Sequence, residues 1–344
     1  MPHADSAPTR ATTRRGRRRR RAVRRGLIAA AVVVALLASA VGAGALLLRS
    51  EVTKNVTTLP ASQVFPDEAQ RPAPSKGAKN ILLLGSDSRQ ASDQHDLDGA
   101  GGQRSDVMML AHIPADRSGV QIMSIMRDTW VDVPGHGQAK INAALAWGGV
   151  PLTVRTVENL LGVRIDHVAI IDFAGVEGIT TALGGVWVDN AMPFTSGGHF
   201  FAAGPIELEG PLALRYVRER HAFATADYQR VQNQQALLKG ILDRAVSRDV
   251  LGDPRQLLGF VSETSKYLTV DSGFTTGEAA SLAYSLRGID GSAIAFFTMP
   301  TAGTGTSADG QSIIRLDPGA LAKVRSALAG DSLQELAKSP SADR

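Results

Sequence analysis

A run of 22 residues without a charged side chain, Leu27–Leu48, restricts what this chain can fold into more than any other feature. As a helix rising about 1.5 Å per residue, it would be about 33 Å long, enough to cross a bilayer core of about 30 Å. Ten arginines and a single acidic residue, Asp5, lie before it in residues 1–26. Because positively charged flanks stay in the cytoplasm, we expect a cytoplasmic tail at 1–26, one transmembrane helix at 27–48 and an extracytoplasmic remainder at the cell membrane.

Two other interpretations of this N-terminal region compete. A cleavable signal peptide also has a basic start, and Ala38-Ser39-Ala40 imitates a cleavage site, but its apolar run is usually about 7 to 15 residues long. The arginines could bind acidic lipid headgroups or nucleic acid. The tail carries a net charge of +9 within a chain of net charge +4, so the remainder is at −5. Since basicity is confined to the tail, we expect a membrane partner and no nucleic acid.

Several classes of site are excluded by what the sequence lacks. The chain has no cysteine, which rules out disulfides, thiolate metal sites and a cysteine nucleophile. It also has no P-loop, G-x-S-x-G, H-E-x-x-H or G-x-G-x-x-G pattern. The commonest nucleotide, esterase and zinc-protease interpretations are therefore unsupported.

After the predicted anchor, residues 49–78 carry four prolines and no sustained apolar period, so we expect a stalk. From Lys79 onward, apolar strand patterns alternate with helical ones, which predicts an α/β domain over 79–330, with helices on both sides of a central mixed sheet. Residues 331–344 look like a frayed tail. The predicted strands are 79–85, 107–113, 120–126, 168–173, 186–188 and 294–299; the predicted helices are 141–147, 152–161, 176–183, 227–246, 254–265, 276–286 and 318–328.

Charged side chains gather where the predicted strands begin and end. Asp87 and Arg89 follow the first strand, Arg104 and Asp106 precede the second, and Arg127 and Asp128 follow the third. Ligands of open α/β sheets bind at the carboxyl ends of strands. These positions are therefore candidates for a binding site.

A second group of candidates lies in YVRER (216–220) and DYQRVQNQ (227–234). If the first piece is extended, Arg218 and Arg220 point to the same side, because strand side chains alternate. Arg230 and Gln234 are one helical turn apart, and Asp227 suits the N-cap of their helix. Three guanidinium groups would then meet near a helix N-terminus, which favours an anion.

Arginine forks bind phosphate oxygens in pairs, so such a cluster suits a diphosphate, and a hard divalent ion would offset the repulsion among neighbouring aspartates. The pattern indicates Mg-assisted phosphoryl transfer. The alternative from the residues alone is that the arginines are surface ion-pair partners of Glu219, Asp227 and Asp128.

Taken together, the motifs resemble the LytR-CpsA-Psr (LCP) family of cell-wall glycopolymer ligases. The matching stretches are NILLLGSDSR (80–89), RSDVMML (104–110), SIMRDTWVDVPGHGQAKINAALAWGG (124–149), IIDFAGV (170–176), LGGVWV (183–188), LEGPLALRYVRER (208–220) and DYQRVQNQQ (227–235).

The resemblance implies an extracytoplasmic enzyme that transfers a glycosyl phosphate, the glycopolymer, from a polyprenyl-pyrophosphate carrier to peptidoglycan and releases polyprenyl phosphate. It implies that Asp87 and Asp106 hold Mg²⁺ or Mn²⁺. The implied pyrophosphate-binding set is Arg104, Arg127, Lys140, Arg218, Arg220, Arg230 and Gln234. Catalytic roles would fall to Arg127, Arg218, Arg220, Asp87 and Asp106, with Asp227 supporting Arg220 and Arg230.

A polyprenyl tail needs an apolar channel, which nine helical positions could line or which could simply be core: Val157, Leu160, Leu161, Val176, Ile179, Leu183, Leu237, Leu238 and Ile241. Two other functions stay open, a transcriptional regulator and a non-catalytic binder of lipid-linked glycans. A tail of 26 residues is too short for a folded DNA-reading domain, and phosphate contacts carry no base information, which disfavours the regulator. The sequence does not name the glycopolymer, the acceptor hydroxyl or the length of the lipid.

Overall fold

The computed structural model describes residues 53–86, 105–172, 174–223, 226–287, 289 and 293–337. Contacts divide the chain into two units, Met1–Ser50 and Glu51–Arg344, and every described residue lies in the second. No helix in the described part of the chain is long and apolar enough to cross a membrane. The tail and the transmembrane helix predicted at 1–48 lie outside the described residues.

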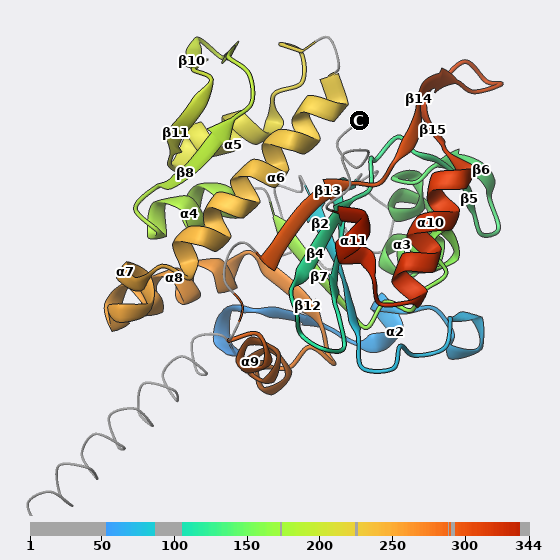
Figure 1. Cartoon of the computed structure of the whole chain (residues 1–344), viewed down its shortest axis with the longest axis horizontal. Helices are drawn as coiled ribbons and strands as arrows, with labels where there is room; N and C mark the ends of the chain where they lie inside the picture. Colours follow the sequence, from blue (N-terminus) through green and yellow to red (C-terminus); the bar gives the residue numbers. More distant parts are fainter. Residues whose placement is uncertain are drawn as a thin grey trace, which may run out of the picture. The chain divides into compact units, whose positions relative to one another are not determined.

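A seven-stranded mixed sheet forms the centre of this unit (Figure 1). Its strands, in spatial order, are β1 (Thr57–Leu59), β12 (Leu268–Asp271), β7 (His167–Asp172), β2 (Lys79–Ser86), β3 (Ser105–Ile113), β4 (Val120–Ser124) and β13 (Ile294–Thr298). β2 is parallel to β7 and antiparallel to β3, and β4 is parallel to β13. The mixed sheet predicted from the sequence is confirmed.

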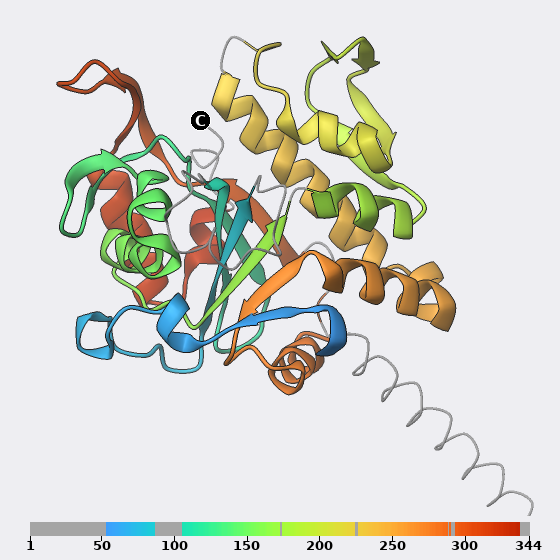
Figure 2. The ribbon, with the colours of Figure 1, turned by 180° about the vertical axis from the view of Figure 1, so that it is seen from behind.

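Helices cover both faces of the sheet, because side chains on a strand point alternately to either side (Figure 2). On one face, Leu82 and Leu110 pack with α3 (Ala143–Leu161), α10 (Pro318–Ala329) and α11 (Leu333–Ala337). On the other face, Ile81 and Met109 pack with α6 (Ala226–Ala245) and α9 (Thr276–Ser285). This is the layered α-β-α arrangement that the alternating patterns predict.

In the described part of the chain, four two-stranded sheets and several further helices surround these layers. Three of these sheets are hairpins, which pair β5 (Trp130–Val133) with β6 (Gly137–Lys140), β9 (Phe194–Ser196) with β10 (His199–Phe201), and β14 (Thr301–Thr306) with β15 (Ser312–Leu316); the fourth pairs β8 (Val186–Asn190) with β11 (Gly204–Leu208). The further helices are α2 (Ala61–Val64), a 3-10 turn at Glu68–Gln70, α4 (Ala174–Ala182), α5 (Gly210–Arg218), α7 (Arg248–Gly252) and α8 (Pro254–Lys266). An apolar cluster beside the sheet joins α4, α5, α6 and α8 to β8–β11.

Residues 57–78 are not a stalk, which corrects the boundary expected at Lys79. β1 pairs with β12 and so belongs to the central sheet, and Leu59 and Val64 are buried. Arg71 forms a buried ion pair with Glu158 of α3 at 2.8 Å between Nη2 and Oε1. A three-residue strand is too short to show a period, and prolines interrupt helical patterns without preventing single side chains from packing.

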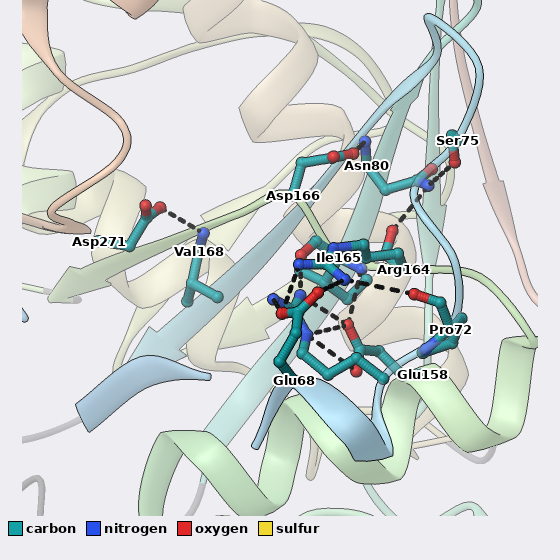
Figure 3. Close-up of polar contacts among 11 residues, drawn as sticks. Glu68, Pro72, Ser75, Asn80, Glu158, Arg164, Ile165, Asp166, Val168 and Asp271 are labelled. Carbon is teal, nitrogen blue, oxygen red and sulfur yellow. Dashed lines mark hydrogen bonds and ion pairs between the residues drawn. The ribbon is translucent and has the colours of Figure 1, made fainter. Parts of the chain in front are cut away.

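The edge of the sheet where β2 and β7 begin, which we call the rear edge, carries a further ion pair to this segment and hydrogen-bonded carboxylates (Figure 3). Arg164 donates to both carboxylate oxygens of Glu68 at 2.6 and 2.8 Å. Asp271 accepts from the backbone N–H of Val168 at 3.0 Å. Because these side chains are hydrogen-bonded within the fold, we assign them a structural role.

The C-terminal prediction also needs correction in part. α11 folds against the sheet, and Leu333 is fully buried in the same cluster as α3 and α10. The short helix is five residues long, too short for a clear helical period. Residues 338–344 lie outside the described residues.

Candidate active site

The candidate residues that the structure describes lie at the edge opposite the rear edge, which we call the site edge. β2, β4, β7 and β13 end there and β3 begins there, as their pairing directions require. Ser86 is in register with Asp172 of β7 and with Ser105 of β3. Asp87 and Arg104 lie outside the described residues. Asp106 belongs to β3, although its side chain is not among those described.

Arg127 and Lys140 approach one carboxylate at the site edge. Asp128, four residues beyond β4, lies 3.2 Å from Lys140 Nζ and 3.6 Å from Arg127 Nε. The β5–β6 hairpin positions Lys140 there, and Asn142 N donates to the Arg127 carbonyl at 3.2 Å. These distances bring two cationic side chains together at the end of β4.

Arg218 and Arg220 do not lie on an extended strand, which corrects the expectation for YVRER. Arg218 is the last residue of α5, and the chain becomes extended only at Glu219. α5 forms because Ala213, Tyr216 and Val217 are buried at helical spacing, with Pro211 in its first turn. Both arginines are exposed, Arg218 at the end of the helix and Arg220 in the following loop.

Glu219 shapes that loop. One of its carboxylate oxygens accepts from the backbone N–H groups of Arg220, His221 and Ala222 at 2.7 to 3.0 Å. Partial burial alone would raise the pKa of Glu219, but the hydrogen bonds from Ser196 and these three amides hold it below its ordinary value. Glu219 therefore fixes the backbone on which Arg220 stands.

α6 brings the second group to the site edge. Arg230 and Gln234 share one buried face of the helix, with 5% and 6% of their surface exposed. Met126 packs in one apolar cluster with Val231 and Ile314, so the neighbours of Arg127 and Arg230 meet. Gln235 donates to Ser124 Oγ of β4 at 2.8 Å, and Asn233 donates to the Tyr216 carbonyl of α5 at 3.3 Å. α6 begins at Ala226, so Asp227 is the second helical residue and not the expected N-cap.

An apolar cavity of about 270 Å³ opens beside these residues. Its wall reaches Gly85 of β2, Val107 of β3 and Val217 of α5, so the chain leads from the wall to Asp106 and Arg218 in one residue and to Asp87 in two. Gln234 lines it, and its buried Nε2 has no hydrogen-bond partner among the described residues. The cavity therefore joins an apolar interior to the predicted diphosphate site.

The cavity separates the nine channel candidates into two groups. Val176, Ile179, Leu237, Leu238 and Ile241 line it. Val157, Leu160, Leu161 and Leu183 are ordinary buried core, because α3 covers the opposite face of the sheet and Leu183 packs under β8.

Sequence reasoning missed some residues of this site. Asp172 lines the cavity at the end of β7, and strand-end position, which identified Asp87, could have found it. Phe260 and Thr264 of α8 also line it. The packing of α8 against α4 brings them there, and no pattern in the sequence predicts that contact.

The described residues alone do not make a metal site: no group of three His, Asp or Glu side chains among them could hold an ion. The donor chemistry nevertheless suits Mg²⁺: Ser86, the last residue of β2, is in register with Asp172 of β7 on one side and with Ser105 of β3, the residue before Asp106, on the other. Carboxylate oxygens are the ligands that hard cations prefer. The end of β7, with Asp172, and the start of β3, with Asp106, therefore offer donors of the kind that a divalent cation prefers.

Comparison with known proteins decides the family. The model of the LytR_cpsA_psr family matches residues 49–330. The chain belongs to the LytR_cpsA_psr family. The match confirms the resemblance inferred from the motifs, and it includes the segment that packs ahead of Lys79.

The chain is similar to several known proteins, among them two relatives by sequence and two solved structures. The polyisoprenyl-teichoic acid--peptidoglycan teichoic acid transferase TagU of Enterococcus faecalis is 34% identical over 234 residues, 66% of this chain and 73% of that protein. The probable cell wall biosynthesis protein LcpB of Corynebacterium glutamicum is 38% identical over 218 residues, 61% of this chain but only 52% of that protein. Bacillus subtilis TagV superposes with a TM-score of 0.62 at 25% identity, covering 75% of this chain and 98% of TagV. TagT bound to LI-WTA gives 0.59 at 25%, covering 78% and 98%.

Proposed function

We propose that this LCP protein transfers a glycopolymer, as its glycosyl phosphate, from a polyprenyl-pyrophosphate carrier to peptidoglycan. The observation that carries the proposal is the apolar cavity whose wall ends beside the predicted diphosphate residues. An isoprenoid tail suits the apolar part, and the guanidinium and amide donors suit the head group. The relative TagU is named as a transferase of teichoic acid to peptidoglycan, which is the same class of reaction.

In the proposed reaction, an acceptor hydroxyl attacks the phosphorus that carries the glycan. A new P–O bond forms, the P–O bond to the polyprenyl phosphate breaks with its electron pair on that leaving group, and the hydroxyl proton passes to solvent. Arg127, Arg218, Arg220 and Arg230 would bind the phosphate oxygens, with Lys140 and Arg104. Gln234 Nε2, buried on the cavity wall, would donate to an oxygen of the head group.

Mg²⁺ or Mn²⁺ would be held by Asp87 and Asp106, where it would offset the charge that builds on the leaving phosphate. We expect Asp87→Asn and Asp106→Asn to slow single-turnover transfer about 100-fold or more, since a metal contributes several kcal/mol at this kind of transition state. Affinity for the lipid diphosphate should change much less, because the arginines would hold it. Unchanged rates in both variants, or full activity in EDTA, would show that the aspartates are structural.

The deciding experiment incubates the full chain in vesicles with a lipid-linked donor and peptidoglycan, and measures release of polyprenyl monophosphate. Arg220→Ala is the test variant, and Arg255→Ala, an exposed arginine of α8, is the matched control. We expect release with the parent and the control, and loss in the test variant. Tight donor binding without release in the parent would instead establish the non-catalytic binder.

We also propose a single-pass topology, with residues 1–26 cytoplasmic, 27–48 in the membrane and the folded unit outside. The basis is the charge distribution along the chain. Two reporters fused after Arg344 test the topology: one that is active only outside the membrane should be active, and one that is active only in the cytoplasm should be inactive. Activity restricted to a cytoplasmic reporter would overturn the topology and also exclude peptidoglycan as the acceptor.

A further inference from the structure

An exposed aromatic pair lies on the side of the sheet away from the cavity. Trp147, in the first turns of α3, keeps 49% of its surface exposed. The exposed ring of His136 stacks on it, with ring centroids 4.8 Å apart and planes 24° from parallel. We name this pair the aromatic platform.

Two backbone features place the platform. α3 is interrupted directly after Trp147, where Gly148 and Gly149 leave helical geometry and Gly149 adopts φ 63° and ψ −157°. A side chain would be strained in that conformation. His136 stands at the tip of the β5–β6 hairpin between Gly135 and Gly137, both at positive φ. A broken helix and a tight turn therefore present the two rings to each other.

The hairpin that carries the platform also carries a residue of the candidate site. His136 and Lys140 are four residues apart along an extended segment, about 13 Å. Lys140 lies beside Asp128 and Arg127. A ligand that reaches from the phosphate group along β6 would meet the platform.

The geometry of the proposed reaction indicates which ligand would reach the platform. The cavity lies on the face of β2 to which Leu83 points, whereas β5, β6 and α3 pack on the face of Leu82. In phosphoryl transfer the attacking and leaving oxygens are roughly in line. If the leaving polyprenyl phosphate is on the cavity side, the attacking hydroxyl comes from the side of β5, β6 and α3.

We infer that the aromatic platform of Trp147 and His136 binds a pyranose ring of the acceptor glycan strand. The inference rests on the proposed function, because it takes the cavity as the place of the leaving group. A pyranose has an apolar face of C–H groups that stacks on a flat aromatic ring, while its hydroxyls stay in water. Trp147 offers such a ring, held in place by the stacked His136 before any ligand arrives.

The test measures binding without turnover. The full chain in detergent is titrated calorimetrically with uncrosslinked glycan fragments of peptidoglycan. We expect Trp147→Ala to weaken binding about tenfold, equivalent to about 1.4 kcal/mol. Trp147→Tyr should restore most of it, and His136→Ala should cause a smaller loss. Trp187→Ala is the matched control, since Trp187 of β8 is 62% exposed and belongs to neither the cavity nor the platform.

The outcomes separate this inference from the proposed function. Unchanged fragment binding in Trp147→Ala, or an equal loss in Trp187→Ala, would overturn the inference even if the parent transfers glycopolymer. Weaker binding of the lipid-linked donor alone would assign the platform to the donor glycan and overturn the acceptor assignment. Fragment binding that depends on Trp147 in a protein without transfer activity would support the inference and refute the proposed function. Equal melting temperatures of Trp147→Ala and Trp147→Tyr show that the comparison reports binding rather than folding.

Discussion

The two edges of the central sheet use charge differently. At the rear edge, Arg71 has Glu158 and Arg164 has Glu68, and in the first pair both side chains are at least 95% buried. At the site edge, Arg127 and Lys140 both approach the carboxylate of Asp128, and Arg218 and Arg220 are exposed. Buried, hydrogen-bonded charges hold elements together, whereas exposed arginines near strand ends suit an anionic ligand. Four predictions, from the largest effect to the smallest, test this difference.

The largest effect is expected on stability at the rear edge. Glu158→Ala should lower the free energy of unfolding by about 3 to 5 kcal/mol, because it removes the buried carboxylate that accepts from Arg71 and leaves only the exposed Glu68 at 3.9 Å. Ile165 N also loses its acceptor, now at 2.9 Å from Glu158. Denaturant unfolding of the variant measures the change. A loss below about 1 kcal/mol would mean that this pair contributes no more than a surface ion pair does.

The next effect is on activity at the site edge. Arg218→Ala and Arg220→Ala should each lose about 10- to 150-fold in transfer, the equivalent of a charge-assisted hydrogen bond of about 1.5 to 3 kcal/mol. Arginine-to-lysine variants should recover only part, since an ammonium lacks the planar fork. Melting temperatures should stay near that of the parent. If they fall together with activity, the arginines serve the fold, and the two edges do not differ.

The third prediction concerns pH and the rear edge. Burial alone would raise the pKa of Asp271, but hydrogen bonds from His167 and the backbone of Val168 and Gly273 hold it below its ordinary value. A carboxyl group with a lowered pKa contributes stability that is fully present above its unfolded pKa, about 3.9, and is lost as the pH falls through the folded value. Asp271→Asn should therefore flatten the acid limb of a melting-temperature profile below about pH 4. An unchanged acid limb would contradict this assignment.

The smallest effect is expected for Arg164→Ala. Its partner Glu68 keeps 72% of its side chain exposed, and exposed ion pairs contribute little because water and salt screen them. Thermal unfolding should show a far smaller shift than for Glu158→Ala. A shift of similar size would mean that burial does not determine how much each ion pair contributes to stability.

The sequence predicts best where a long period exists. β2, β7, α6 and α10 were placed within a residue or so, since a buried strand or a helical face of many residues repeats its pattern often enough to be seen. The hairpin strands β5, β6, β9 and β10 were missed, because three or four residues show no period. YVRER was taken as extended although Ala213, Tyr216 and Val217 have helical spacing, since the helix begins upstream at a Gly-Pro pair.

The candidate site was predictable as residue types but not as a shape. Arginines and aspartates at strand ends could be named because pairing directions place those ends at one edge. The cavity could not be predicted, because its lining residues Phe260 and Gln234 come from different helices that only tertiary packing brings together. Asp172 was within reach of the same strand-end rule and was overlooked.

Under the proposed topology, the pairing of β1 with β12 would limit how far the folded unit can work from the membrane. With the predicted anchor ending at Leu48 and β1 fixed in the sheet from Thr57, eight residues separate the two, an extended reach of at most about 32 Å over nine peptide steps. A long flexible arm would let the site edge search the thickness of the wall. A connection of eight residues would instead confine the site edge to the innermost layer of the wall. Newly made glycan strands beside the membrane would then be the acceptors, and mature outer strands would lie out of reach.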